Sequence, residues 1–142
     1  MKAHGAGARG TGFTLVEVAV VLALAALLAS TALPSFQAQL HKSRRTDAVA
    51  ALTRVQWAQE QFRAHHGLYA QQLTQLKGAG HGLSAEGLYA IELRAVGPTG
   101  YVAAARALAD RAQASDRACQ EITLGVHEGL ASHGPTARCW NR

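Results

Sequence analysis

The chain has 142 residues, a formal net charge of +5 and 6% aromatic residues. This length favours one domain of modest size rather than several. The charge is only mildly basic, and no run of Lys or Arg interleaved with aromatic residues gives a stacking platform for bases. The composition therefore gives no support for nucleic acid as a partner, but it does not exclude one.

Residues 1–12 are short, basic and Gly-rich, without apolar clusters, which predicts a leader peptide. An ordinary secretory signal peptide is cleaved after its apolar region, at small residues. Here the junction Gly12-Phe13 lies before the apolar region. Cleavage at this junction leaves the whole apolar segment on the mature protein, with a new amino terminus at the edge of the membrane.

The segment from Phe13 to Leu33 contains 21 residues and a single charge, Glu17. A helix of about this length crosses a bilayer core of roughly 30 Å. A carboxylate inside that core costs roughly 2.5–3.5 kcal/mol on insertion scales, so Glu17 is a functional candidate that needs a partner. The alternative is an acid near the interface that reaches the headgroups of an ordinary membrane anchor.

The sequence G-F-T-L-V-E, followed by an apolar segment and a proline, resembles the class III signal of type IV pilins and related pseudopilins. The resemblance implies that a prepilin peptidase/N-methyltransferase cuts after Gly12 and methylates the new amine of Phe13. It also implies that Glu17 pairs with the Phe13 amine of a neighbouring subunit. Opposite charges attract far more strongly in a low-dielectric core than in water, so this pairing is expected to set the register of assembly.

Pro34 ends the apolar run, and it removes one helical hydrogen bond while its ring clashes with the preceding turn. We therefore expect a helix kink or a local opening at Pro34. In the pilins that the segment resembles, the helix can melt near a proline at this position on entering the filament. Ala26 stands where many pilins have glycine, so the extent of melting stays open.

Apolar and small residues recur beyond Pro34 with helical spacing, which predicts one helix over residues 13–65, stopped by Gly67. Its expected apolar face carries Phe36, Leu40, Ala48, Ala51, Leu52, Val55, Ala58 and Phe62. Its expected solvent face carries Arg45, Asp47, Arg54, Gln56 and Arg63. The basic cluster of His41, Lys42, Arg44 and Arg45 is expected to be solvated, or to lie near anionic headgroups.

Residues 67–87 predict a connecting loop with a short helical piece around 71–76. Alternating and β-branched residues predict a hairpin of strands 88–96 and 101–108, followed by strands at 122–126 and 129–132. The Ala-rich segment 103–112 would by itself prefer helix, so the second strand is open to shortening. We expect an α+β chain with the type IV pilin fold, in which one antiparallel sheet packs on the long helix.

Cys119 and Cys139 both lie beyond the targeting segment, and their even number suggests a disulfide in an oxidising compartment. The alternative is two buried free thiols. The tail around these cysteines resembles the disulfide-bounded end of small type IV pilins, which implies that Trp140 packs over the bridge rather than binding a ligand. Gly129 and Gly134 fit turn positions.

Metal, cofactor and enzyme sites are not expected. His65 and His66 are adjacent in the helix and therefore point about 100° apart, with no third ligand nearby in sequence. Asp110 and Asp116 are too sparse for a calcium cage. Ser115, Asp116 and the scattered histidines form no nucleophile motif.

The resemblance implies a structural subunit of a type IV pilus, most similar to small PilE-type minor pilins. It divides the chain into a leader at 1–12, a transmembrane or filament-core helix at 13–34, an amphipathic half at 35–66, a loop at 67–87 and a sheet with the disulfide region at 88–142. Implied partners are other pilin subunits, the peptidase, the inner-membrane assembly machinery and the bilayer.

The same resemblance implies a single-pass inner-membrane protein with a periplasmic C-terminal region, which becomes part of an extracellular pilus. Twitching motility, adhesion and DNA uptake are roles of the family that this sequence does not separate. The alternatives are a pseudopilin of a type II secretion system and a membrane-anchored periplasmic binding domain.

Overall fold

The computed structural model describes residues 12–142, so residues 1–11 of the expected leader lie outside the described residues. The chain divides into an N-terminal unit, Met1–Gln37, and a C-terminal unit, Ala38–Arg142, which are described separately below. The elements are α1 (Leu15–His66), β1 (Tyr89–Arg94), β2 (Gly100–Ala107), β3 (Glu121–His127) and β4 (Leu130–Gly134), with short 3-10 helices η1 (Leu73–Gln75), η2 (Ala112–Ser115) and η3 (Ala137–Trp140).

Helix α1 ends within one residue of the predicted position, at His66. Gly67 follows with a φ of +74°, a left-handed conformation that favours glycine. Its N–H donates to the carbonyl of Arg63 at 2.8 Å, which satisfies one of the free carbonyls in the last turn. The predicted stop signal is confirmed.

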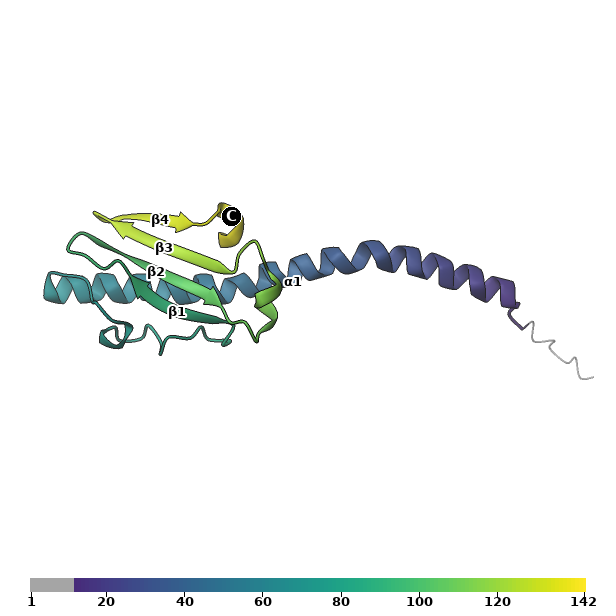
Figure 1. Ribbon diagram of the computed structural model, residues 1–142, viewed down its shortest axis with the longest axis horizontal. Helices are drawn as coiled ribbons and strands as arrows, with labels where there is room; N and C mark the ends of the chain where they lie inside the picture. The colour runs from purple at the N-terminus through teal and green to yellow at the C-terminus, as the bar shows by residue number, and fades with distance from the viewer. Residues whose placement is uncertain (1–11) are drawn as a thin grey trace, which may run out of the picture. The chain divides into compact units, whose positions relative to one another are not determined.

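The four strands form one antiparallel sheet in the order β1-β2-β3-β4, in agreement with the predicted strands (Figure 1). Strand β2 extends to Ala107 despite the helix preference of its alanines. Its register pairs Ala103 with both Leu93 of β1 and Leu124 of β3, so it donates and accepts ladder bonds on both sides. Tertiary pairing therefore overrides the local preference.

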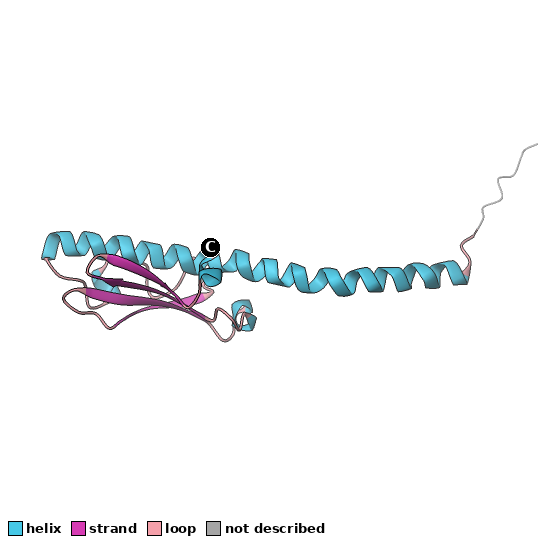
Figure 2. Cartoon of the chain, turned by 90° about the horizontal axis from the view of Figure 1, so that it is seen from above, coloured by secondary structure: helices cyan, strands magenta, loops and turns pink. Residues whose placement is uncertain are grey.

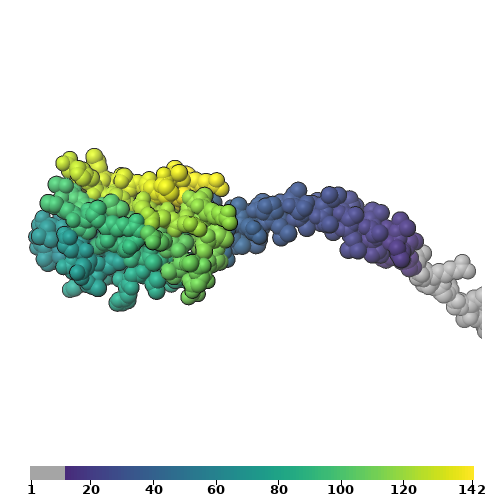
Figure 3. All heavy atoms as spheres, viewed as in Figure 1, coloured from purple at the N-terminus to yellow at the C-terminus, as the bar shows by residue number. Residues whose placement is uncertain are grey.

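The core of the C-terminal unit lies between one face of the sheet and the C-terminal half of α1 (Figures 1 and 2). Small residues on both sides allow close approach, since Ala48 and Ala51 of α1 and Ala103 and Ala105 of β2 are buried together. The larger core side chains are Leu52, Val55, Tyr69, Tyr89, Ile91, Tyr101, Ile122, Leu124 and Val126. The opposite face of the sheet is the one seen in the space-filling view (Figure 3).

Two expectations for the helix faces are wrong: Arg45 and Asp47, expected on the solvent face, are buried. Both side chains contact other segments of the C-terminal unit. Arg45 donates to Asp116, and the carboxylate of Asp47 accepts from the N–H of Glu86 at 3.2 Å. Phe36, expected on the apolar face, is exposed and belongs to the N-terminal unit. The buried face of α1 thus begins after Phe36, and it includes two polar positions that lie outside the predicted apolar stripe.

The loop after α1 is held to the helix by a buried amide. The Gln59 side chain donates to the carbonyl of Ala70 at 3.0 Å and accepts from the N–H of Ala70 at 2.8 Å. The predicted short helical piece is present as η1.

The C-terminal segment is closed by a disulfide between Cys119 and Cys139, with Cα atoms 5.5 Å apart. This confirms the bridge over the free-thiol alternative. Gly129 has a φ of +81° in the turn between β3 and β4, as a turn position requires. Gly134 is instead the last residue of β4, where a Cβ would lie 2.6 Å from the hydroxyl of Thr123 on the paired strand.

Trp140 is buried at 5% exposure, and its packing over the bridge stays a prediction. Its ring meets His133 edge-on at 4.4 Å, and its indole N–H donates to the carbonyl of Gly134 at 2.9 Å. The side chain therefore fastens η3 to β4.

Candidate assembly helix and basic surface

The N-terminal unit exposes an apolar helix along its whole described length. Residues 15–32 of α1 belong to a stretch long and apolar enough to cross a membrane, by length and composition, and none of that stretch is buried. Its exposed large side chains are Phe13, Leu15, Val16, Val18, Val20, Val21, Leu22, Leu24, Leu27, Leu28, Leu33 and Phe36. Such a surface is unfavourable in water, so it requires a cover of lipid or of other protein.

Glu17 lies in the first turn of α1, three residues after Thr14. The Glu17 N–H donates to the Thr14 hydroxyl at 3.2 Å, so Thr14 caps the helix. The sequence T-x-x-E is the spacing of a capping box, a signal that the sequence analysis missed. The Glu17 carboxylate is exposed and is close to the helix N-terminus, where the macrodipole favours a negative charge.

Gly12 and Phe13 precede α1 and are both exposed. Among the described residues 12–142, no atom outside Gly12 and its chain neighbours lies within 4 Å of a Cβ built at Gly12.

Pro34 lies inside α1, and the helix continues through it. Hydroxyl groups around the proline bond within the helix: Ser30 to Leu27, Thr31 to Leu28 and Ser35 to Ala32, at 2.7–3.0 Å. These polar groups therefore need no external partner, which suits an apolar surrounding. The kink at Pro34 stays a prediction.

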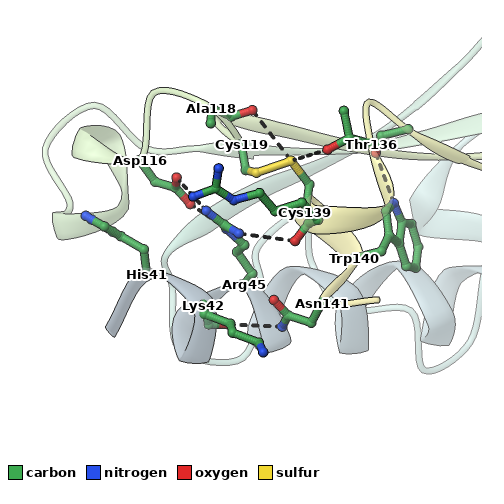
Figure 4. The surroundings of a disulfide bond; sticks show 12 residues. His41, Lys42, Arg45, Asp116, Ala118, Cys119, Thr136, Cys139, Trp140 and Asn141 are labelled. Carbon is green, nitrogen blue, oxygen red and sulfur yellow. Dashed lines mark hydrogen bonds and ion pairs between the residues drawn. A yellow bond between two sulfur atoms is a disulfide. The ribbon is translucent and has the colours of Figure 1, made fainter. Parts of the chain in front are cut away.

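A buried ion pair connects α1 to the segment before the disulfide. The Arg45 guanidinium donates from Nε to Asp116 Oδ2 at 2.7 Å and from Nη2 to Asp116 Oδ1 at 2.8 Å, with both residues at 5% exposure (Figure 4). A bidentate geometry of this kind is the strong form of a charge-assisted hydrogen bond. The hydrogen bond that Arg45 donates to Asp116 raises the pKa of Arg45 against the effect of burial, so the guanidinium is charged.

Further hydrogen bonds complete this pair. Arg45 Nη1 donates to the carbonyl of Arg138 at 3.1 Å, and the Gln113 amide donates to Asp116 Oδ2 at 2.7 Å. The Asn141 amide donates to the carbonyl of Lys42 at 3.0 Å (Figure 4). Together with the disulfide, these contacts bring α1, the end of η2 and η3 to one place.

This place concentrates the positive charge of the C-terminal unit. Residues 38–46, 114–120 and 134–142 hold six Lys or Arg side chains and one acid, whereas the rest of the unit holds six Lys or Arg and seven acids. The acid, Asp116, is neutralised by Arg45. We call the other five cations the basic cap: Lys42, Arg44, Arg117, Arg138 and Arg142. Within residues 12–142 they make no ion pair.

The cations of the sheet are neutralised locally instead. Arg94 bonds to Glu121 at 3.0 Å and also to Glu92, and Arg106 lies 3.3 Å from Glu121. The hydrogen bond from Arg94 lowers the pKa of Glu121, and bonds to Glu121 and Glu92 raise the pKa of Arg94. This face therefore presents little net charge.

Sequence reasoning missed the Arg45–Asp116 pair and the basic cap. The partners are 71 residues apart, and no local pattern relates them. His65 and His66 lie in the last turn of α1, and within residues 12–142 no group of three His, Cys, Asp or Glu side chains could hold a metal ion.

Comparison with protein families decides the family. The model for the prokaryotic N-terminal methylation motif matches residues 8–33, the segment that contains Gly12, Phe13 and Glu17. The model described as type IV minor pilin ComP, DNA uptake sequence receptor, matches residues 34–123, well over half of the chain. The chain belongs to this type IV minor pilin family.

No curated protein matches the pilin in sequence. The two family matches meet at residues 33 and 34, so together they cover the methylation motif, the rest of α1 and strands β1 to β3. The protein is a minor subunit of a type IV pilus, as the resemblance of its N-terminal segment implied. Neither a pseudopilin of a type II secretion system nor a membrane-anchored periplasmic binding domain is favoured. Its long helix and four-stranded antiparallel sheet give the expected α+β pilin-like fold.

Proposed function

We propose that the pilin is a non-enzymatic filament subunit that is cut after Gly12, methylated on Phe13 and held in the inner membrane by residues 13–34. Its C-terminal unit then faces the periplasm, where the disulfide is compatible with the oxidising conditions. The assembly machinery transfers the apolar helix from the bilayer into a filament of pilin subunits. The observation that supports this is the uncovered apolar surface of the N-terminal unit, which both environments can cover.

Glu17 provides the first test of this function. We expect Glu17→Val and Glu17→Gln to leave cleavage and methylation intact but to lower incorporation into pili by at least about tenfold. Either variant leaves the Phe13 amine without its partner in a dry core, and an unpaired buried charge costs about 3–5 kcal/mol. Mass spectrometry of the N-terminus checks processing, and immunoblots of sheared pili check incorporation.

Thr14→Ala is the matched control. It removes the cap of α1, at a cost of about 1 kcal/mol, but leaves the carboxylate in place. If Glu17 acts through its charge, Thr14→Ala assembles far better than Glu17→Gln. Normal assembly of Glu17→Gln would exclude the pairing role, and equal defects in both variants would assign Glu17 to helix capping.

We further propose that this pilin is a DNA receptor that contacts phosphates through the basic cap. Two observations support it. The matching family is described as a DNA uptake sequence receptor, and the basic cap holds five of the seven Lys and Arg side chains of the C-terminal unit that make no ion pair within residues 12–142. Lys and Arg contacts to phosphates supply most of the sequence-independent affinity for DNA. The buried pair beneath the cap fixes the backbone at Arg138.

The salt dependence of duplex binding tests the cap. Each phosphate contact contributes about 0.9 to the slope of log K against log salt concentration for a duplex. The variant Arg117→Gln/Arg138→Gln should therefore weaken binding and lower that slope by about 2. Binding of a labelled duplex to the full-length pilin in detergent micelles, measured by fluorescence anisotropy from low to high salt, gives this slope.

Arg94→Gln/Arg106→Gln is the matched control, because it removes the same number of positive charges from the neutralised sheet face. We expect its slope to equal that of the wild type. Equal losses in both variants would mean that only the net charge matters and would exclude the basic cap as the site.

A further inference from the structure

An exposed tryptophan lies on the outer side of α1 in the C-terminal unit. Trp57 is 65% exposed, although most tryptophans are largely buried. It lines a groove of about 430 Å³ together with Thr53 and Arg54 of α1 and with Lys77 and Gly78 of the loop after η1. Neither Arg54 nor Lys77 makes an ion pair within residues 12–142.

A second groove of about 480 Å³ adjoins the first, since Lys77 lines both. It is lined by Phe62, His65 and His66 of α1, and the rings of Phe62 and His66 are stacked with centroids 4.0 Å apart. Within residues 12–142, no acidic residue lines either groove. Aromatic rings and cations without an ion pair within residues 12–142 thus line two adjoining grooves.

This combination fits a flexible anionic ligand with aromatic rings. Single-stranded nucleic acid is bound by cations that follow its backbone and by aromatic side chains on which its bases stack. Duplex DNA keeps its bases stacked within the helix, so its ring faces are not available to Trp57. Arg54 and Lys77 line the same groove as the indole, so both cations are available to the phosphates next to a stacked base.

We propose that the groove of Trp57, Arg54 and Lys77 is a subsite for unpaired nucleotides, in which a base stacks on the Trp57 indole. The subsite rests on the proposed function of DNA reception and adds a preference for single strands to it. A second copy of this chain is a poorer occupant, because its α1 presents the same cations and would bring like charges together.

The test compares two probes, a (dT)12 oligonucleotide and a blunt, fully paired 12-bp duplex, on the full-length pilin in detergent micelles. We expect Trp57→Ala to weaken (dT)12 binding by about 5- to 150-fold, the range given by loss of one stacked base. Trp57→Phe should retain most of the affinity, and the duplex should bind all three proteins within about twofold. Lys77→Gln should lower the salt slope for (dT)12 by about 0.7.

Leu130→Ala is the control for loss of an exposed apolar side chain, since Leu130 lies on β4 and is also largely exposed. It should change neither affinity. Because Trp57 is exposed and Trp140 is buried, the emission of Trp140 in the Trp57 variants also reports whether the fold is intact.

Unchanged (dT)12 affinity in Trp57→Ala would overturn the subsite. If the duplex still bound through Arg117 and Arg138, the DNA receptor function would stand without the Trp57 subsite. If the wild type bound neither probe, both the receptor function and the subsite would fail. A Trp57→Ala protein that bound (dT)12 normally but no longer entered pili would assign the helix face to subunit contacts, and would equally overturn the subsite.

Discussion

Asp116→Ala should lower the free energy of unfolding of the C-terminal unit by about 3–5 kcal/mol, the range for removal of one partner from a buried ion pair. The variant leaves the Arg45 guanidinium at the same buried place without its carboxylate. Most of this cost is the desolvation of an unpaired charge rather than the worth of the pair itself. For a unit of about 100 residues, such a loss lowers the midpoint of thermal unfolding by at least about 10 °C.

Replacing both Arg45 and Asp116 separates the cost of an unpaired buried charge from the contribution of the ion pair itself. Arg45→Met/Asp116→Leu removes the charges together, so it should recover much of the lost stability, because buried pairs are often replaced by apolar residues at little cost. Arg106→Ala is the surface control: its ion pair with Glu121 is exposed, and such pairs contribute about 0–1 kcal/mol. Thermal unfolding followed by Trp140 emission in a Trp57→Phe background gives the midpoints. If Asp116→Ala lowered the midpoint of thermal unfolding as little as Arg106→Ala, the buried ion pair would not stabilise the contact between α1 and the segment before the disulfide.

Loss of the disulfide is the second large effect. In the chain-entropy model, a bridge across the observed separation of 20 residues stabilises the fold by about 3 kcal/mol. Cys139→Ser should therefore weaken the C-terminal unit by a similar amount and raise its sensitivity to protease. Because the bridge holds η3, where Arg138 lies, the loss should also weaken duplex binding by the basic cap.

The double variant Cys119→Ser/Cys139→Ser avoids a free thiol, and reductant provides its control. Adding reductant to the wild type should lower its midpoint to that of the double variant, whereas the double variant itself should not respond. Wild-type protein whose midpoint and protease resistance stayed unchanged after reduction would show that the bridge does not stabilise the unit.

Local patterns predicted those features in which neighbouring residues determine the structure. Helical spacing together with Gly67 placed the end of α1 within one residue, and alternation with turn residues found all four strands. The apolar run with Glu17, the Gly12-Phe13 junction and the proline pointed to the family that the comparisons established. The T-x-x-E cap of α1 is also a local pattern, because Thr14 and Glu17 are three residues apart.

The sequence by itself thus determined the pilin family and the elements and favoured the disulfide, because periodicity, turn residues and cysteine number can be read without the tertiary structure. Only the tertiary structure decided which polar residues are buried. Arg45 was predicted to be solvated since a helical wheel contains no information on a carboxylate 71 residues away. The basic cap and the Trp57 groove likewise arise from segments that meet only on folding, because charge and ring geometry at a surface depend on long-range packing.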